Sequence, residues 1–313
     1  MQPLPRFDAD TWLLLLNPVS GRGSGLRRRA GIEAALAAQG LRCHTQVSEY
    51  AGHSVALVRA ALAAGCRRLL IAGGDGSVSE AVNGIFSQDQ VAPAQVRLAL
   101  LPIGTGNDWA RGLGLPQRID DVARLLGNHR LRALDVGRID FPETGARRYF
   151  INVAGGGFDA QVIERMPSRR FGRLAYVIGL LRGLAAYRPL PLRLEAASGP
   201  AHAQAFVLFA CLGRYCGGGM LVAPQAQSDD GQLDFTLIHH MSRLRVLHAL
   251  PRLFDGSLLA HPRVQAWCGR EAHLAAPPGT AIQADGELVG HAPVRFSVLP
   301  QALPVVVPQS GPA

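Results

Sequence analysis

Three glycine-rich loops carry the residues of this chain whose types and spacing could do chemistry. They span residues 20–25, 73–77 and 104–107, and each lies between a predicted strand and a predicted helix. Glycine lets the backbone approach an anion closely, and the first turn of a helix points N–H groups and a positive partial charge at it. One such loop would be typical of an ordinary turn. Three at successive strand–helix junctions favour a ligand that bears phosphate groups.

Carboxylates accompany these loops. Asp75 lies inside the second loop and Asp108 directly follows the third. A carboxylate among phosphate-binding N–H groups would repel the ligand unless a metal ion or an arginine lies between them. Each aspartate therefore has two interpretations: it caps the following helix, or it takes part in binding Mg²⁺. A further acidic sequence, Asp285-Gly286-Glu287, is by itself typical of a hairpin turn, because Asp-Gly is a favoured turn pair.

The composition excludes several enzyme classes. The chain contains no lysine, so all 32 basic side chains are arginines, against 23 acidic ones, for a net charge of +9. A Walker-A P-loop, the protein kinase fold and Schiff-base or pyridoxal-phosphate enzymes all need a lysine. A phosphate site must here use arginine, backbone N–H groups or a metal ion. The charge permits a nucleotide, a nucleic acid or a lipid headgroup as partner, and codon drift from lysine to arginine would produce it too.

The cysteine and hydropathy patterns indicate a cytoplasmic protein. The five cysteines include no C-x-x-C pair, so neither a zinc site nor a disulfide framework is indicated. The N-terminus lacks the basic and apolar regions of a signal peptide. No apolar run approaches the ~18 residues needed to span a bilayer.

Apolar periodicity divides the chain near residue 134. Before it, strands and helices alternate, which predicts a mostly parallel sheet. The strands expected there are 11–16, 41–47, 68–72 and 96–103, and the helices are 26–38, 53–64, 78–86, a segment from 109, and 120–126. After it, short strands predict an antiparallel sandwich or barrel, interrupted by helices at 169–187 and 242–254. The strands expected there are 132–139, 148–154, 190–196, 205–212, 233–239, 264–266, 273–275, 281–284 and 294–298.

Four motifs, in this order, resemble the diacylglycerol kinase catalytic-domain family. They are Asn17-Pro18-x-Ser20-Gly21-Arg22-Gly23, Gly73-Gly74-Asp75-Gly76-Ser77, Gly104-Thr105-Gly106-Asn107-Asp108 and Ala284-Asp285-Gly286-Glu287. The resemblance covers nearly the whole chain. It implies an α/β fold class, with a Rossmann-like three-layer α/β domain at 1–134, a β-sandwich lipid-binding domain at 135–299 and a C-terminal tail at 300–313, as in the NAD kinase and diacylglycerol kinase superfamily.

The resemblance also implies a nucleotide site. The positions that match the family's ATP-binding residues are Asn17, Ser20, Arg22, Ser48, Gly73, Gly74, Asp75, Gly76, Ser77, Val78, Ser79, Thr105 and Asn107. Three of them depart from the family pattern. Ser48 and Ser77 each replace a threonine and keep the hydroxyl, whereas Arg22 replaces a lysine and turns a point charge into a planar fork.

Further positions match the family's catalytic and metal residues. Asp75, Asp108 and Asp135 match aspartates around a catalytic Mg²⁺, and Asp285, accompanied by Glu287, matches the general base. A loop resembling the family's structural Mg²⁺ site offers Asp230 with the carbonyl groups of Gln227 and Gln232. Residues 155–159 and 217–220 resemble loops that line the lipid cleft.

The function that the resemblance implies is an ATP-dependent, Mg²⁺-dependent lipid kinase. It would transfer the γ-phosphate of ATP to a hydroxyl of a diacylglycerol-like or a sphingosine- or ceramide-like membrane lipid. We expect a cytoplasmic protein, peripheral at the inner face of the membrane; a homodimer is compatible with this, and no nucleic acid is expected as partner. The basic, apolar segment 169–187 could contact the membrane or pack on the sandwich. An NAD kinase-like phosphotransferase and a catalytically silent nucleotide-binding module are the alternatives.

Overall fold

A computed structural model describes residues 6–165, 183–184, 189–200 and 202–309, without the side chains of Arg22, Ser24 and Arg165. The chain divides into two compact units. Residues 1–134 and 301–313 form one, called here the α/β unit, and residues 135–300 form the other, called the β unit. The predicted helix at 169–187 lies almost wholly outside the described residues. Among the helices of the described ranges, none combines the length and apolarity needed to cross a bilayer.

The α/β unit is built on a parallel sheet with strand order β2-β1-β3-β4. Its strands are β1 (Trp12–Leu16), β2 (Cys43–Val47), β3 (Arg68–Gly73) and β4 (Arg97–Pro102). All five residues of β1 are buried, as expected of a strand covered on both faces. Because the strands are parallel, the loops after β1, β3 and β4 meet at one edge of the sheet.

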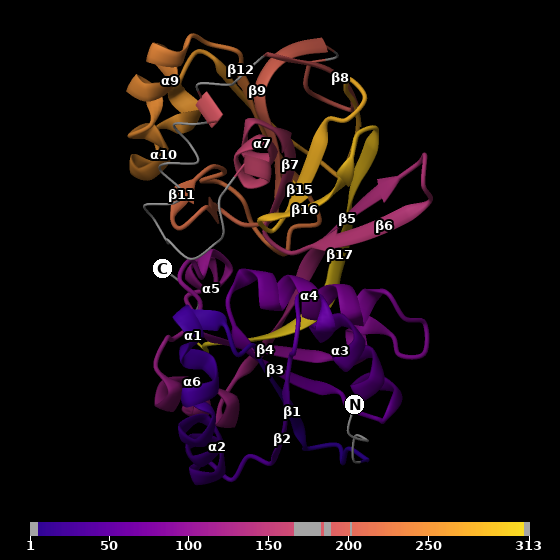
Figure 1. The fold of residues 1–313 in the computed structure, drawn as a ribbon, viewed down its shortest axis with the longest axis vertical. Helices are drawn as coiled ribbons and strands as arrows, with labels where there is room; N and C mark the ends of the chain where they lie inside the picture. The colour runs from indigo at the N-terminus through magenta and orange to yellow at the C-terminus, as the bar shows by residue number, and fades with distance from the viewer. Residues whose placement is uncertain (1–5, 166–182, 185–188, 201, 310–313) are drawn as a thin grey trace. The chain divides into compact units, whose positions relative to one another are not determined.

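Helices cover both faces of this sheet (Figure 1). They are α1 (Ser20–Arg27), α2 (Arg29–Ala38), α3 (His53–Ala63), α4 (Asp75–Phe86), η1 (Pro93–Gln95), α5 (Asp108–Gly112) and α6 (Ile119–Gly127). Ile32 of α2 and Leu126 of α6 share one apolar core with Leu14 of β1. The expected helix 26–38 is in fact two helices, and α1 begins at Ser20. Glycine is a poor helix former, so the glycine-rich sequence concealed this start.

The β unit is an antiparallel assembly with strand order β16-β15-β7-β9-β8-β14-β17, and β12 pairs with both β9 and β13. Its strands are β5 (Arg130–Phe141), β6 (Ala146–Phe150), β7 (Val153–Gly157), β8 (Leu190–Ala196), β9 (His202–Cys211), β10 (Tyr215–Cys216), β11 (Met220–Leu221), β12 (Leu233–His239), β13 (Val264–Gly269), β14 (Glu271–Ala275), β15 (Ala281–Ala284), β16 (Glu287–His291) and β17 (Val294–Val307). Its helices are α7 (Phe158–Arg165), α9 (Arg243–Ala249), α10 (Arg252–Asp255) and η3 (Leu258–Ala260).

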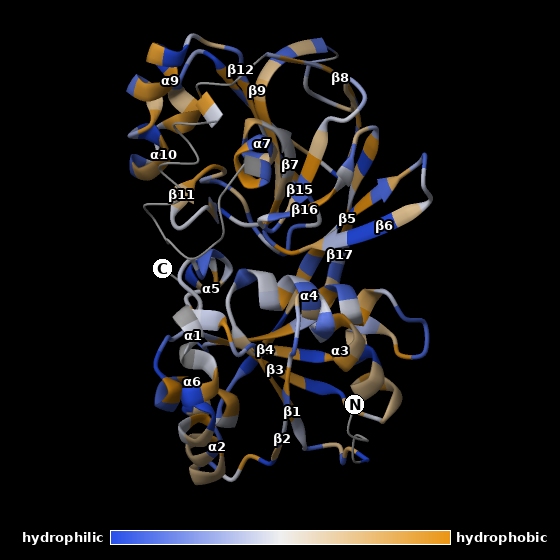
Figure 2. Ribbon diagram, viewed as in Figure 1, coloured by the Kyte–Doolittle hydropathy of each residue, from blue (hydrophilic) through white to orange (hydrophobic). Residues whose placement is uncertain are grey.

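Strand β9 separates two apolar cores of the β unit. Leu208 and Ala210 face one core, whereas Val207 and Phe209 face the other, as the two-residue period of a strand requires. The second core is covered by α7, α9 and α10. Hydrophobic residues in Figure 2 concentrate along these strands.

Three local expectations need correction. The predicted strand 148–154 is two strands, because β6 ends at Phe150 and β7 starts at Val153. The predicted helix 242–254 is broken into α9 and α10 before Arg252, since Pro251 has no N–H to continue the helix. The expected tail at 300–313 continues β17 to Val307, and Val305 pairs in parallel with Leu98 of β4.

Candidate active site

The second and third glycine loops of the α/β unit touch through their backbones. A Cβ placed on Gly104 would lie 2.6 Å from the Cα of Gly74, and one on Gly74 would lie 3.1 Å from the Cα of Gly104. The N–H groups of Ile103 and Gly104 donate to the carbonyl of Gly73 at 2.9 and 3.3 Å. Only glycine permits this approach, so the two loops form one backbone surface.

The loop after β1 joins this surface through Asn17. Its side-chain Nδ2 donates to Oγ of Ser77 at 3.0 Å, and its backbone N–H donates to the carbonyl of Ala72 at 3.2 Å. The Oγ of Ser20 lies 3.7 Å from a Cβ placed on Gly73. The three loops that the sequence singled out therefore converge at the carboxyl edge of the sheet.

Asn107 presents an unsatisfied acceptor beside these loops. Its backbone is left-handed, with φ of 52°, and its Nδ2 donates to the carbonyl of Gly104 at 2.9 Å. Its Oδ1 is buried and has no hydrogen-bond partner among the described residues. That oxygen lies 3.7 Å from a Cβ placed on Gly74. Buried acceptors are normally paired, so this oxygen is an exception among the residues around the loops.

Asp75 caps a helix, but a different one from that expected. Its Oδ2 accepts the N–H of Asp108 and its Oδ1 accepts the N–H of Trp109, both at 3.1 Å. It thus caps α5, which belongs to the third loop, whereas its own helix α4 begins at Asp75 itself. Asp108 is buried and pairs with Arg111 at 2.7 Å. A Cβ on Gly106 would lie 3.2 Å from Oδ2 of Asp75 and 4.0 Å from Oδ2 of Asp108, so both carboxylates border the third loop.

The remaining predicted nucleotide residues fall into three groups. Ser48 is buried after β2, and its N–H donates to the carbonyl of Leu16 at 3.0 Å. Gly76, Val78 and Ser79 belong to the first turns of α4, and Thr105 is exposed in the third loop. The side chain of Arg22 lies outside the described residues.

Sequence reasoning missed Glu80. Its Oε1 accepts the N–H of Gly52 at 2.8 Å and its Oε2 accepts the N–H of Ser54 at 3.2 Å. This carboxylate of α4 therefore caps α3. Capping patterns are searched within a few residues of a helix start, and Glu80 lies well beyond that window, so no local signal could reveal it.

In the β unit, Asp285 occupies the hairpin turn between β15 and β16. Asp285 and Gly286 have φ of 48° and 82°, which is the left-handed pair that a type I′ turn needs. The Asp285 carboxylate accepts three main-chain N–H groups, from Ile151 at 3.1 Å, Asn152 at 3.0 Å and Val153 at 3.2 Å. The turn interpretation is correct for the backbone, and the carboxylate is held in one orientation by the β6–β7 connection. Glu287 begins β16.

Asp135 and the loop around Asp230 are also connected. The Asp135 N–H donates to the carbonyl of Ser228, and its Oδ2 accepts the N–H of Gly231, both at 2.7 Å. Oδ1 of Asp230 accepts the N–H of Gln232 at 3.0 Å. Within the described ranges no three His, Cys, Asp or Glu side chains cluster as metal ligands. The expected loop site uses one carboxylate with carbonyl oxygens, a donor set that suits a hard cation.

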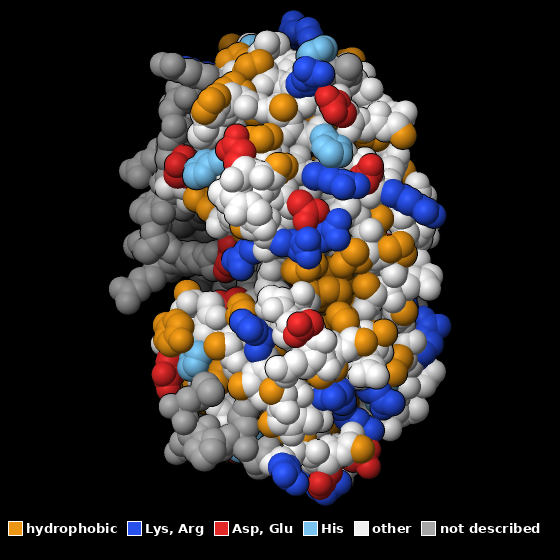
Figure 3. Space-filling view, turned by 90° about the vertical axis from the view of Figure 1, so that its right-hand side faces the viewer, with side chains coloured by type: hydrophobic (Ala, Val, Ile, Leu, Met, Phe, Trp, Pro, Cys, Tyr) orange, Lys and Arg blue, Asp and Glu red, His pale blue; other side chains and the backbone are white. Residues whose placement is uncertain are grey.

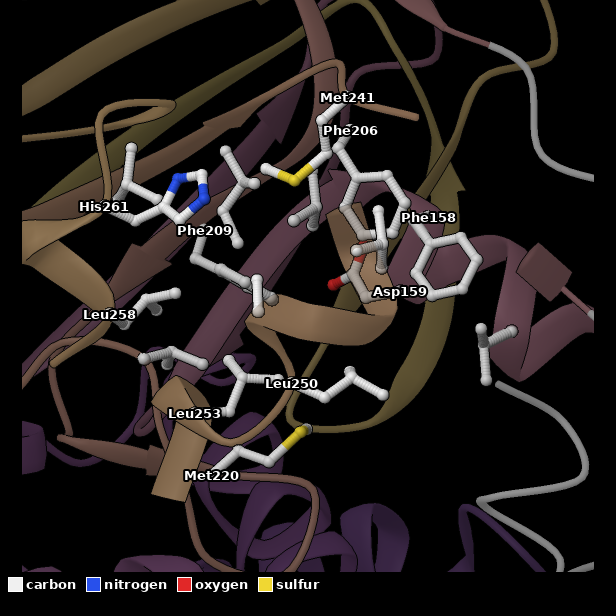
Figure 4. A pocket seen from close by; sticks show the side chains of 17 residues that line it. Phe158, Asp159, Phe206, Phe209, Met220, Met241, Leu250, Leu253, Leu258 and His261 are labelled. Atoms are coloured by element: carbon white, nitrogen blue, oxygen red, sulfur yellow. The ribbon is translucent and has the colours of Figure 1, made fainter. Parts of the chain in front are cut away.

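The β unit also contains an apolar cavity of about 70 Å³ that is partly open to solvent (Figure 4). Phe158 and Met220, from the two segments that resemble lipid-cleft loops, line it, as does Asp159. Figure 4 shows the Asp159 carboxyl group turned toward the cavity. Its Oδ1 accepts the N–H of Ala160 at 2.8 Å, and its buried Oδ2 makes no hydrogen bond of good geometry with any described residue. Burial raises the pKa of Asp159 to about 6, against the lowering effects of the Ala160 N–H and of the Gln283 side chain.

Comparison with known proteins assigns this architecture. Residues 11–139 match the diacylglycerol kinase catalytic domain, and residues 152–307 match the YegS C-terminal NAD kinase beta sandwich-like domain. A diacylglycerol kinase of Mycobacterium tuberculosis is 33% identical over 98% of each chain. The chain belongs to the diacylglycerol kinase family. This family consists of phosphotransferases that act on lipids.

Two further similarities agree with membership of the diacylglycerol kinase family. A Chromohalobacter salexigens protein named "Probable lipid kinase YegS-like" is 32% identical, covering 96% of this chain and 94% of its own. The structure of a diacylglycerol kinase from Bacillus anthracis superposes with a TM-score of 0.72 and 21% identity, covering 96% of this chain and 97% of that one. This likeness confirms the expected fold class, an α/β domain followed by a β-sandwich.

Proposed function

We propose that this protein transfers the γ-phosphate of ATP to a hydroxyl group of a membrane lipid of the diacylglycerol or the sphingosine and ceramide type. The observation that carries the proposal is the convergence of the three glycine loops in the α/β unit. Such loops let main-chain N–H groups reach phosphate oxygens. The names of the relatives support a lipid as the acceptor.

In this proposal the nucleotide phosphates lie against the joined surface of Gly73, Gly74 and Gly104. Ser20, Ser77 and Thr105 supply hydroxyl donors, and Asn107 supplies the buried acceptor oxygen. The full proposed set is Asn17, Ser20, Arg22, Ser48, Gly73, Gly74, Asp75, Gly76, Ser77, Val78, Ser79, Thr105 and Asn107. Without a lysine, the site depends on backbone donors and on arginine for positive charge.

Magnesium fits this donor chemistry in two places. Mg²⁺ usually takes one or two protein carboxylates and completes its shell with phosphate oxygens and water, so a cluster of protein ligands is not required. We propose Asp75, Asp108 and Asp135 as the carboxylates of the catalytic ion, which when bound would neutralise charge on the phosphates. We propose a structural ion held by Asp230 and the carbonyls of Gln227 and Gln232. In the absence of nucleotide, when the catalytic ion lacks its phosphate ligands, Asp230→Ala should then abolish most of the rise in Tm that Mg²⁺ produces.

Asp285, accompanied by Glu287, is proposed as the general base. The lipid hydroxyl would give its proton to the Asp285 carboxylate while its oxygen forms the new bond to phosphorus and the bond to the ADP oxygen breaks. A carboxylate held by three main-chain N–H groups is fixed in orientation, which favours proton transfer along one direction.

The apolar cavity of the β unit supports the lipid part of the proposal. Hydrocarbon side chains such as Phe206, Val222 and Leu250 line it, and Asp159 is its buried carboxyl group. A lipid chain would bury its surface against the hydrocarbon wall. The hydroxyl-bearing end would bond to Asp159, whose second oxygen makes no hydrogen bond of good geometry with any described residue. We propose that the protein meets this lipid as a cytoplasmic enzyme, peripheral at the inner face of the membrane.

A labelled-ATP screen tests the function. Purified protein with Mg²⁺ is offered a total lipid extract and, separately, NAD, and each labelled product is identified by mass. A phosphorylated lipid supports the proposal. Labelled NADP would establish the NAD kinase-like alternative instead. Binding of ATP with no product from any acceptor would establish a silent nucleotide-binding module.

A further inference from the structure

The short helices α9 and α10 expose large apolar side chains to solvent. Leu244 is 70% exposed, Leu247 is 39% exposed and Phe254 is 61% exposed. Leu244 and Leu247 are three residues apart, so they share one face of α9. Figure 2 shows hydrophobic and hydrophilic residues mixed along α9. Apolar residues grouped on one short segment mark an interaction surface, whereas single ones are ordinary.

The opposite face of the same helices forms a wall of the apolar cavity. Val246, Ala249 and Leu250 line the cavity from α9 and its end, and Leu253 lines it from α10. Val246 is buried, whereas its neighbour Leu247 is exposed. Each helix is thus apolar on two sides. One side packs against the apolar residues around the cavity. The other side is exposed, and no described residue covers it.

The exposed face is basic as well as apolar. Arg243 and Arg245 are exposed on α9, and neither makes an ion pair with any residue in the described part of the chain. Between residues 240 and 263 the only carboxylate is Asp255, whose Oδ1 accepts the N–H of Ser257 at 2.8 Å. The face of the β unit that Figure 3 shows differs from the outer face of α9 in its charges, since basic and acidic side chains lie side by side there. On β5 and β6, for example, Arg138 and Arg147 both pair with Asp140.

We propose that the outer face of α9 and α10, formed by Leu244, Leu247 and Phe254 with Arg243 and Arg245, docks on an anionic lipid bilayer. This inference rests on the proposed function and names the surface that meets the membrane. Arginines attract anionic headgroups while the apolar side chains insert below them. A second protein copy would bury the leucines equally well, but two copies of one basic helix repel each other. The charge therefore selects the bilayer.

Docking in this way gives the cavity its substrate supply. The helices that touch the bilayer on one side line the cavity on the other, so a hydrocarbon chain passes between two apolar environments that share one wall. Exposing that chain to water is unfavourable for every CH₂ group that leaves an apolar environment. The arrangement therefore shortens the distance over which the lipid chain would be exposed to water between the bilayer and the cavity.

Vesicle co-sedimentation without ATP tests the docking surface. Wild-type protein should bind vesicles of phosphatidylcholine with phosphatidylglycerol, and bind phosphatidylcholine alone about tenfold or more weakly. The variant Leu244→Ser/Leu247→Ser/Phe254→Ser should lose about tenfold or more of the vesicle affinity. The control Leu288→Ser changes a 42% exposed leucine on β16 of the same unit and should bind as wild type. Equal binding by the triple variant and wild type would overturn the proposal.

Two further measurements separate membrane docking from misfolding and from self-association. Arg243→Gln/Arg245→Gln leaves the apolar side chains in place and should remove most of the salt-dependent part of vesicle binding, so the surface is tested even if the triple variant does not fold. With a short-chain, water-soluble diacylglycerol, all variants should keep the turnover of wild type. Sedimentation velocity compares wild type with the triple variant. If wild type is a dimer, the triple variant is a monomer and both bind vesicles equally, the face is a subunit contact and the proposal is refuted. No turnover with any lipid would refute the proposed function and leave the vesicle result standing.

Discussion

Asn17 donates a hydrogen bond from its side-chain amide to the hydroxyl of Ser77 at 3.0 Å, across 60 residues of sequence. This bond joins the loop after β1 to the first turn of α4. It is a side-chain link between the first and second glycine motifs. Their hydrogen bond holds the loop after β1 and the start of α4 together as one surface.

Removal of this bond should weaken nucleotide binding. Asn17→Ala and Ser77→Ala should each raise the KM for ATP about tenfold, which corresponds to about 1.4 kcal/mol. Because the two residues bond to each other, the loss of binding free energy in the double variant should be about 1 kcal/mol smaller than the sum of the two single-variant losses. Ser77→Thr should keep the activity, since the hydroxyl remains. Ser87→Ala, at the other end of α4, is the control. Strict additivity would show that the bond does not matter for the site.

The contact between Gly74 and Gly104 predicts a steric effect. Gly104→Ala would place a methyl group 2.6 Å from the Cα of Gly74 and 2.7 Å from Oδ1 of Asn107. We expect a loss of stability of about 1–3 kcal/mol by chemical denaturation, together with loss of ATP binding by calorimetry. Gly112→Ala in α5 is the matched control, because a Cβ there meets nothing within 4 Å. If both variants bind ATP like wild type, the loops do not form the nucleotide site.

Asp285→Asn separates chemistry from structure. The amide keeps the shape but is a far weaker proton acceptor, so phosphoryl transfer should be abolished while the affinity for ATP stays within a few-fold. The same change places an NH₂ group near the N–H groups of Ile151, Asn152 and Val153. Thermal unfolding of the variant is therefore measured beside its kinetics. Wild-type turnover with a lowered Tm would show that Asp285 serves the hairpin and not the reaction.

Asp159 predicts a stability change with pH. Burial raises the pKa of this carboxyl from 3.8 to about 6 in the folded protein. The folded state then binds more protons than the unfolded state between these values, so this residue lowers the free energy of unfolding as pH rises from about 4 to 6. At pH 7.5, the free energy of unfolding of Asp159→Asn should exceed that of wild type by up to about 3 kcal/mol. The difference should nearly vanish below pH 4. A pH-independent difference would contradict this charge assignment.

The sequence predicted the parts of the fold that depend on local pattern. The buried strand β1, the turn at Asp285-Gly286 and the glycine loops all have signals within a few residues, and the structure contains them. The family resemblance brought the correct architecture as well. What sequence reasoning misjudged depends on distant partners or on glycine and proline. Asp75 caps α5 across 33 residues, α1 starts within a glycine-rich run, and the proline-containing end of the chain is a strand.

The site showed the same division. The positions of the three loops after parallel strands predicted that these loops meet, because parallel strands bring their carboxyl ends to one edge, and the structure brings them together. The Asn17–Ser77 bond, the Glu80 cap and the burial of Asp159 arise only when the chain is folded. Hydrophobic patterning could not reveal the outward Leu244 and Leu247 either, since a helix with two apolar sides has no single period to read.

The pairing of Val305 with Leu98 has a consequence for biosynthesis. The ribosome makes β4 about two hundred residues before the strand segment that shields its outer edge. Until the segment around Val305 is synthesised, that edge offers its amide and carbonyl groups to any nascent strand nearby. The α/β unit is therefore completed only after the whole β unit has been synthesised, although its first 134 residues are made first.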